Sequence, residues 1–212
     1  MKITGKNLFR LLKENANTLQ PQLRLAIDGF NNYSLRLVPT NPNYLDDSDI
    51  KLLTTLRNHY VKSFLTEFDA NDSQTASWLA KIVHEDDSRI LFIIENEAHE
   101  RLGYMGLAYI NWNKSYVEAD AIVSSGRTPK GLMTCALRAL LTWAKQYLHL
   151  ENVGVRVLSD NPALTFYKKM GFVETQRVPL RRTEKEGFIA WIEDSSLITS
   201  DRYLVHHQWN EH

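Results

Sequence analysis

Apolar positions recur along the chain with two different periods, and each period predicts a different kind of element. Apolar residues three or four positions apart predict amphipathic helices over 6–17, 46–64, 74–83, 131–145 and 161–170. Alternating or β-branched runs predict strands over 34–39, 89–95, 102–112, 116–123, 153–157, 172–178, 188–192 and 203–208. The charged stretch 181–185 is predicted to be a loop.

The order of these elements predicts the fold class α+β, with a mostly antiparallel central sheet and helices on both of its faces. Three strands between residues 89 and 123 follow one another with only short polar turns, which is typical of an antiparallel meander. Residues 1–33 hold one amphipathic helix followed by turn-forming residues. We predict that they form an N-terminal extension that packs on the core or reaches a partner subunit. Residues 34–212 are the predicted main domain.

Composition narrows the class of protein. A chain of 212 residues with 43% apolar and 24% charged residues is long enough for one well-buried domain. Its 25 basic and 25 acidic residues cancel, which argues against nucleic-acid or anionic-membrane partners but still permits a local basic pocket. The histidines lack metal-ligand spacing, so we expect no metal site.

The compartment is predicted from cysteine usage and apolar runs. The one cysteine, Cys135, cannot form an internal disulfide and falls on an apolar helix face. A structural thiol is therefore favoured over a nucleophile. Neither a membrane-spanning apolar run nor the apolar core of a signal peptide is present, so we expect a cytoplasmic protein.

The loop before the long predicted helix has the chemistry of a phosphate site. Backbone N–H groups at a helix N-terminus lack internal partners and attract anions. Gly126 and Gly131 would let a ligand approach the backbone closely, while Arg127 and Lys130 add positive charge. Such a helix entry is more often an ordinary loop, so this signal needs support from a second motif.

A second motif, further along the chain, supplies that support. The helix start reads Gly131-Leu132-Met133-x-x-Ala136-Leu137, and the second motif reads Asn161-x-Ala163-x-x-Phe166-Tyr167-x-x-x-Gly171-Phe172. Together they resemble the GNAT superfamily of acyl-CoA-dependent N-acyltransferases, over roughly residues 34–208. The second run, NPALTFYKKMGF, matches the family pattern closely. The first departs from it, because Thr128 stands where Arg or Gln is common and Met133 where Gly or Ala is common.

The resemblance implies a V-shaped GNAT sheet, splayed between the strands at 116–123 and 153–158. Acetyl-CoA, the expected acyl donor, would place its pantetheine in that gap and its pyrophosphate over the helix start. The residues implied to contact it are Ile122, Val123, Arg127, Lys130, Gly131, Leu132, Met133, Thr134, Asn161 and Phe166.

Tyr167 is the implied general acid. Acyl transfer to an amine expels a thiolate, and a phenol near the sulfur can donate a proton or a hydrogen bond to it. In this family a Tyr at the matching position commonly does so. The alternative is that Tyr167 is a core aromatic that packs like its neighbour Phe166.

The amine must be neutral to attack, so a base or a water chain is needed. Glu118 and Asp120 share one face of the strand at 116–123. We assign Glu118 as the base, the alternative being a solvated or ion-paired strand residue. Some family members place a Glu on the following strand, where this chain has Arg156. A backbone N–H at a strand bulge is expected to stabilise the oxyanion.

The helix pair over 46–83 is implied to cover the acceptor. The run LRNHYVKSFL, followed by Gln74-x-x-x-Trp78, resembles the branch that acetylates nucleotide-linked amino sugars and ribosomal-protein N-termini. The candidate acceptor-binding residues are Arg57, Asn58 and Trp78. Arg57 could pair with a phosphate or carboxylate of the acceptor, or it could form a surface salt bridge.

The predicted function is therefore direct transfer of acetyl from acetyl-CoA to a small primary amine. A nucleotide-linked amino sugar is the first acceptor considered, and a protein or peptide N-terminus is the second. A GNAT-fold module that binds acyl-CoA without catalysis is the alternative from another class. A homodimer is compatible with each of these.

Overall fold

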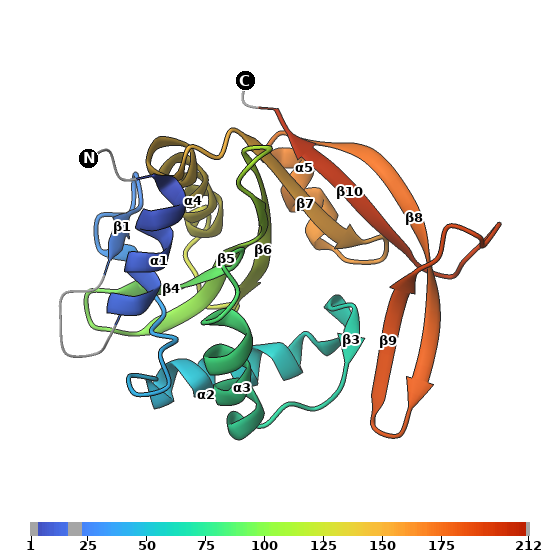
Figure 1. Cartoon of the computed structure of the whole chain (residues 1–212), viewed down its shortest axis with the longest axis horizontal. Coiled ribbons are helices and arrows are strands. Elements are labelled where there is room, and N and C mark those ends of the chain that lie inside the picture. The colour runs from blue at the N-terminus through green and yellow to red at the C-terminus, as the bar shows by residue number, and fades with distance from the viewer. Residues whose placement is uncertain (1–3, 17–22, 211–212) are drawn as a thin grey trace.

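The computed structural model describes residues 4–16 and 23–210. Their strands form one central sheet, and their helices pack around it (Figure 1). The helices are α1 (Gly5–Asn15), α2 (Asp47–His59), α3 (Asp72–Trp78), α4 (Leu132–Leu148) and α5 (Ala163–Lys169). The strands are β1 (Arg24–Ala26), β2 (Tyr33–Leu37), β3 (Thr66–Glu67), β4 (Ile90–Asn96), β5 (Arg101–Asn111), β6 (Tyr116–Ser124), β7 (Asn152–Leu158), β8 (Phe172–Lys185), β9 (Phe188–Glu193) and β10 (Tyr203–Trp209). A 3₁₀ turn at Val61–Ser63 follows α2, and a π-helical turn at Leu79–Val83 continues α3.

The strands form a single sheet in the order β1-β2-β4-β5-β6-β7-β10-β8-β9-β3. Among the described strands only β6 and β7 run parallel, and they pair only over Tyr116–Glu118 and Asn152–Gly154. Beyond Glu118 the two strands diverge, so the sheet opens into a V. The predicted fold class, a mostly antiparallel V-shaped sheet with helices on both faces, is confirmed.

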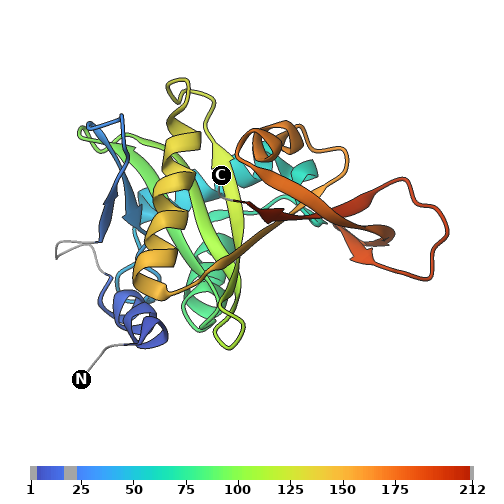
Figure 2. The same cartoon turned by 90° about the horizontal axis from the view of Figure 1, so that it is seen from above.

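Strand β4 shows how the sheet separates two layers of core. Ile90, Phe92 and Ile94 pack in one cluster with α1, α4 and α5, whereas Leu91 and Ile93 pack in another with α2 and the turn after α3. Because successive side chains point to opposite faces, a strand covered on both sides needs an apolar residue at every position. Figure 2 shows α4 crossing the strands on one side and α2 behind them.

The described N-terminal residues share the first of these cores. Phe9 of α1 is fully buried, and Leu25 and Ile27 lie in the same cluster as α4. A Cβ atom on Gly5 would lie 2.2 Å from the Leu148 carbonyl oxygen, so α1 begins directly against the end of α4. Strand β1 extends the sheet by pairing with β2. The boundary after residue 33 stays a prediction.

The loop predicted over 181–185 is wrong, because these residues are the second half of β8. They pair in register with β9, from Leu180 opposite Glu193 to Lys185 opposite Phe188. The resulting hairpin projects from the body of the protein, and its β9 edge pairs with the short β3 (Figures 1 and 2). A hairpin with exposed faces tolerates charged residues, so composition alone does not distinguish it from a loop.

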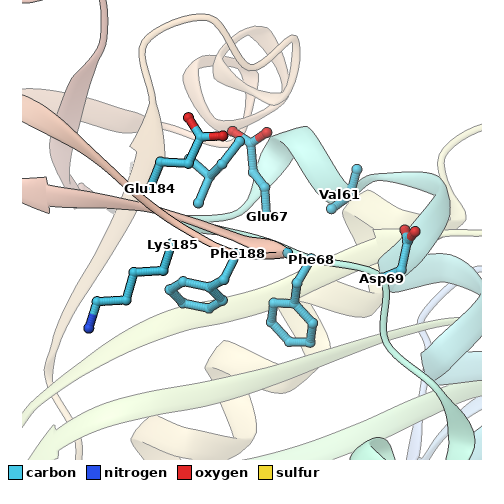
Figure 3. A pocket seen from close by; sticks show the side chains of 9 residues that line it. Val61, Glu67, Phe68, Asp69, Glu184, Lys185 and Phe188 are labelled. Atoms are coloured by element: carbon cyan, nitrogen blue, oxygen red, sulfur yellow. The ribbon is translucent and has the colours of Figure 1, made fainter.

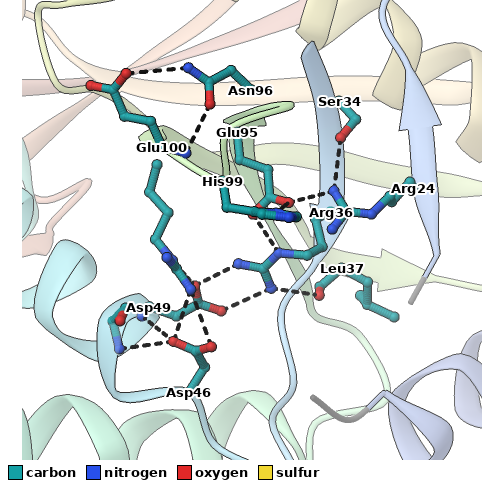
Figure 4. Close-up of polar contacts among 12 residues, drawn as sticks. Arg24, Ser34, Arg36, Leu37, Asp46, Asp49, Glu95, Asn96, His99 and Glu100 are labelled. Atoms are coloured by element: carbon teal, nitrogen blue, oxygen red, sulfur yellow. Dashed lines mark hydrogen bonds and ion pairs between the residues drawn. The ribbon is translucent and has the colours of Figure 1, made fainter. Parts of the chain in front are cut away.

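A buried ion network joins α2 to the sheet (Figure 4). Arg36 donates to Asp49 at 2.6 Å and to Glu95 at 2.7 Å, and all three residues are almost fully buried. Arg101 donates to Asp49 at 2.7 Å, and Arg24 binds the second oxygen of Glu95. Buried charges are tolerated only when paired and hydrogen-bonded in this way. The network therefore holds the start of α2 against β2, β4 and β5.

Candidate active site

A cavity of about 340 Å³ opens between α2, α3 and the strands β5 and β6. Most of its lining is apolar or aromatic, with a few charged groups that converge on the interior. Its walls include Arg57, Phe64, Phe68, Trp78, Tyr104 and Asp120. A concave apolar site with few polar groups is the usual form of a small-molecule site.

Strand β6 carries a bulge where it meets this cavity. Gly106 of β5 lies opposite Asp120, but Tyr104 lies opposite Val123, so two residues of β6 face one residue of β5. Ala121, within the bulge, has φ +52°. A non-glycine residue in this region costs of order 1–3 kcal/mol and persists where the surrounding structure requires it. At the bulge, the regular hydrogen-bond pairing between β5 and β6 is interrupted beside the cavity. Such an interruption is expected where a backbone N–H is to bind an oxyanion.

Asp120 and Tyr167 lie within electrostatic reach of each other at this point. The Asp120 carboxylate lines the cavity and lies 3.4 Å from Nη1 of Arg89. The Tyr167 side chain is 6% exposed and packs edge-to-face on Phe166 and Phe172. Burial, reinforced by the negative charge of Asp120, raises the pKa of Tyr167 far above its ordinary value. The phenol is therefore protonated at neutral pH, the state a general acid needs.

Glu118, the predicted base, has other partners. Its Oε2 accepts a hydrogen bond from Nε of Arg156 at 2.7 Å, and its Oε1 accepts one from the Tyr116 hydroxyl at 3.0 Å. Both carboxylate oxygens are thus engaged, and Glu118 is not among the residues that line the cavity. Arg156 stacks over Tyr109 at 4.1 Å while it pairs with Glu118. Arg156 therefore neutralises the negative charge of Glu118.

The start of α4 leaves backbone N–H groups open. Gly131 precedes the helix with φ +91°, a conformation that favours glycine, and no side chain caps the helix. Among the described residues, neither the N–H of Met133 nor that of Thr134 has a hydrogen-bond acceptor. Leu132 is fully buried and anchors the first turn in the core. The helix start therefore presents free donors and partial positive charge.

Two charged side chains next to this helix start differ in their availability. Lys130 is exposed directly before the helix. Arg127 is exposed as well, but its Nη1 lies 2.7 Å from a carboxylate oxygen of Glu100. Because an exposed ion pair is weak, an anion could compete for Arg127. Lys130 makes no ion pair with another described residue, so an anion could bind it without displacing a carboxylate.

The three predicted acceptor residues do not act alike. Arg57 and Trp78 line the cavity. The Asn58 amide instead makes two hydrogen bonds with the backbone of Ala70, accepting from its N–H at 2.9 Å and donating to its carbonyl at 2.8 Å. Asn58 thereby fixes the loop that forms one wall of the cavity.

The similarity to known proteins agrees with this geometry. The family model of the acetyltransferase (GNAT) domain matches residues 35–173. The chain belongs to the GNAT acetyltransferases. No curated protein sequence matches it.

Solved structures of a spermidine N-acetyltransferase from Vibrio cholerae share the fold of this GNAT acetyltransferase. One, in complex with CoA and spermine, is 17% identical with a TM-score of 0.64, covering 84% of this chain and 94% of that chain. Another, a dodecameric structure in an intermediate state, is 18% identical with a TM-score of 0.58, covering 84% and 92%. At these identities the similarity shows the fold alone.

As a GNAT acetyltransferase, the protein takes its acetyl group from acetyl-CoA. The residues present fit this donor. Past Glu118, β6 has no ladder with β7, which leaves strand backbone open to an amide-bearing pantetheine chain. Half-buried Ile122 and buried Val123 lie on this part of β6. The open N–H groups of α4 and the ammonium of Lys130 suit a pyrophosphate.

Asn161 and Phe166, two further predicted donor contacts, help to build α5 in this GNAT acetyltransferase. The Asn161 Oδ1 accepts a hydrogen bond from the N–H of Ala163, the first residue of the helix, at 2.9 Å, which orders the turn that leads into α5. The Phe166 ring lies 5.3 Å from that of Tyr167 and packs against the main core. Both residues therefore help to position Tyr167, whatever they contact in the donor.

A second, more open cleft of about 250 Å³ lies between β3 and the β8–β9 hairpin (Figure 3). Phe68 borders both cavities, and its ring stacks on Phe188 of the hairpin at 5.8 Å. Glu67 and Glu184 also line the cleft, and Glu67 accepts a hydrogen bond from Arg202 at 3.0 Å. The stack of Phe68 on Phe188 therefore supports one wall of the larger cavity.

The described residues form neither a metal-binding cluster nor a helix that could span a membrane. Within residues 4–16 and 23–210, no group of three His, Cys, Asp or Glu side chains is arranged to hold a metal ion. The helices of the same residues include none with the length and apolar character needed to cross a membrane.

Several residues of the cavity were not predicted from the sequence. Asp120 shares a strand face with Glu118, and alternation alone cannot show which of the two enters the cavity. Tyr104 and Phe68 carry no sequence signal beyond their apolar character. Arg89, at the start of a predicted strand, had only its charge in an apolar context as a signal.

Proposed function

We propose that this GNAT acetyltransferase transfers acetyl from acetyl-CoA directly to a primary amine bound in the cavity between α2, α3 and β6. The observation that carries the proposal is the position of Asp120. It lies beside the β6 bulge, within the cavity and within electrostatic reach of the buried phenol of Tyr167. Tyr167 does not itself line the cavity, but the charge of Asp120 reaches its hydroxyl, so a proton acceptor in the cavity has a proton donor behind it.

Asp120 replaces Glu118 as the proposed base. An ammonium that enters the cavity meets the exposed side of the Asp120 carboxylate, which can take a proton directly or through water. Glu118 is held by Arg156 and Tyr116 outside the cavity lining, so both of its carboxylate oxygens are already engaged away from the bound amine. We assign Glu118 to positioning β6 and β7 where they still pair.

Tyr167 and the bulge have complementary proposed roles. The Tyr167 hydroxyl donates a proton or a hydrogen bond to the sulfur that leaves when the tetrahedral intermediate collapses. The backbone N–H groups of the Ala121 bulge donate to the oxygen that carries negative charge before that collapse. No residue forms a covalent bond to the acetyl group, so donor and acceptor must be bound together.

The acceptor is proposed to be a small amine. Spermidine N-acetyltransferases share the fold, which supports an amine as the acceptor class. A cavity of about 340 Å³ is at the small end of the range for ligand sites. It suits a metabolite-sized amine, so the nucleotide part of a nucleotide-linked amino sugar would lie outside it.

We predict that Tyr167→Phe lowers kcat by about 10²-fold or more, because removing the hydroxyl leaves the thiolate without its proton donor. The change conserves the aromatic packing against Phe166 and Phe172. Thiol release from acetyl-CoA with a panel of amines measures the effect. Binding of CoA, measured by calorimetry, serves as the control for intact folding.

The same assay tests the proposed function as a whole. Unchanged turnover in Tyr167→Phe would show that the acid is another group. Tight CoA binding by the wild type with no thiol release over a broad amine panel would favour the alternative, a module that binds acyl-CoA without catalysis.

A further inference from the structure

Arg57 is a positive charge in the acceptor cavity without an acidic partner. No Asp or Glu among the described residues lies within ion-pair distance of its guanidinium. Its hydrogen bonds go to the carbonyl oxygens of Thr66 at 2.9 Å and Phe68 at 3.3 Å, and to the Thr66 hydroxyl at 3.3 Å. The guanidinium also lies 4.0 Å from the centre of the Phe68 ring and 5.1 Å from that of Phe64.

This environment leaves the charge only partly compensated. Burial lowers the pKa of Arg57, and the more distant Tyr104 and Asp69 only partly offset that effect. An arginine remains charged under these conditions, since its ordinary pKa is so high. Neutral carbonyls and aromatic faces solvate a cation, but they do not neutralise it. A ligand anion would do so.

The other charges of the cavity do not provide that neutralisation. Asp120 is the one acidic residue among the described residues that line this cavity, and it lies 3.4 Å from Arg89. The Nε–H of Arg89 is buried and has no hydrogen-bond acceptor in the described part of the chain. Asp86, which is outside the cavity lining, lies 3.9 Å from the same Nε. Among the described residues that line the cavity, Arg89 therefore has carboxylates within ion-pair distance, and Arg57 is the guanidinium that has none.

The charges are also separated along the cavity. Tyr104 is buried, and burial is the main reason why its pKa is raised. The positive charge of Arg57 lowers this pKa and the negative charge of Asp120 raises it, so both charges act on the same hydroxyl. Arg57 and Asp120 are thus both near Tyr104, without an ion pair between them. A short molecule could place an amine at Asp120 and a second group at Arg57.

We propose that Arg57 binds an acidic group of the acceptor, so that this enzyme prefers small amines that also carry a carboxylate or a phosphate. The inference rests on the proposed acetylation of an amine in this cavity. A polycation such as spermine would instead place an ammonium group beside the uncompensated guanidinium, which is unfavourable. Arginine is the side chain best suited to planar or tetrahedral oxyanions.

A purely structural role for Arg57 makes a different prediction. Its bonds to the Thr66 and Phe68 carbonyls anchor the segment after α2, so its loss could loosen the cavity. That effect would lower turnover of charged and neutral amines alike. The ratio of the two activities, rather than either activity alone, therefore separates the roles.

The test compares kcat/KM for amines matched in length. One series is 5-aminopentanoate, pentylamine and 1,5-diaminopentane, and the other is glucosamine and glucosamine 6-phosphate. For the wild type we expect at least one acidic amine to exceed its neutral counterpart by about 10-fold or more, mainly through KM. The two series tell a carboxylate acceptor from a phosphate acceptor.

The variants decide the role of Arg57. We expect Arg57→Gln to abolish the preference for the acidic amine and Arg57→Lys to keep part of it. Arg177→Gln serves as the matched control, because Arg177 is exposed on β8 and pairs with Glu174 far from the cavity lining. A wild type that prefers the diamine, or an acid preference that survives Arg57→Gln, would overturn the proposal.

A binding measurement keeps this result distinct from failure of the proposed function. If no amine supports thiol release, the acetylation proposal fails, and calorimetric binding of 5-aminopentanoate and glucosamine 6-phosphate still tests Arg57. Binding at least about 10-fold weaker in Arg57→Gln than in the wild type would support the anion site. Equal affinity of both proteins for both compounds would refute it.

Discussion

Asp120→Asn is expected to lower kcat by about 10²-fold or more, because the amide cannot accept the proton that the attacking amine must lose. The substitution keeps the size of the side chain, so the bulge at Ala121 and the lining of the cavity should persist. Steady-state thiol release as a function of pH measures the loss.

Glu118→Gln is the matched comparison, since the two carboxylates lie two residues apart on one strand face. We expect it to affect the free energy of unfolding more than the pH–rate profile, because it weakens the bond to Arg156. If Glu118→Gln instead shifts the profile and Asp120→Asn does not, the base is Glu118 and the cavity assignment is wrong.

Arg36→Ala is expected to destabilise the fold by about 3–5 kcal/mol, the typical cost of removing one partner from a buried ion pair. The substitution would leave Asp49 and Glu95, each 1% exposed, without their main counter-charge. Urea unfolding followed by circular dichroism measures the change. Arg177→Ala, which removes an exposed pair with Glu174, should cost less than about 1 kcal/mol.

The same network predicts a pH dependence with a definite sign. Burial by itself would raise the pKa of Glu95, but the hydrogen bond and charge of Arg36, with a contribution from Arg24, outweigh burial and lower it. A folded-state pKa below the unfolded one stabilises the protein above the ordinary value of 4.5, and the contribution is lost as the pH falls toward the folded pKa.

The wild type should therefore lose stability in acid more steeply than Arg36→Ala. Without Arg36 the pKa of Glu95 is lowered less, so its protonation in acid costs the variant less stability than it costs the wild type. Parallel stability curves for the two proteins between neutral and acid pH would show that the network does not contribute in this way.

Much of the fold could be predicted because its local patterns are strong. The stripe of leucines in α4, the unbroken apolar run of β4 and the Asn161-Pro162 helix start each favour one conformation within a few residues. The motif from Asn161 to Phe172 indicated the family for the same reason. It encodes a helix start, the proposed acid Tyr167 and a glycine at the end of the helix within one short segment.

The site was predicted less completely, because its decisive features are not local. Glu118 and Asp120 are equivalent by alternation, and only pairing with β5 and β7 shows that one meets Arg156 while the other enters the cavity. Arg57 was a charge on a predicted helix. Its lack of an acidic partner depends on how the segment around Phe68 folds back over it.

The sequence by itself determined the order of the longer helices and strands, the sheet-and-helix class and the family of this GNAT acetyltransferase, since these follow from periodicity and from a compact motif. Only the tertiary structure decided which carboxylate lines the cavity, that residues 181–185 continue a strand, and which cation of the cavity has no described carboxylate within ion-pair distance. Strand register, bulges and ion pairs depend on contacts between residues far apart in the chain. The interaction free energies that select them arise only when those residues are packed together.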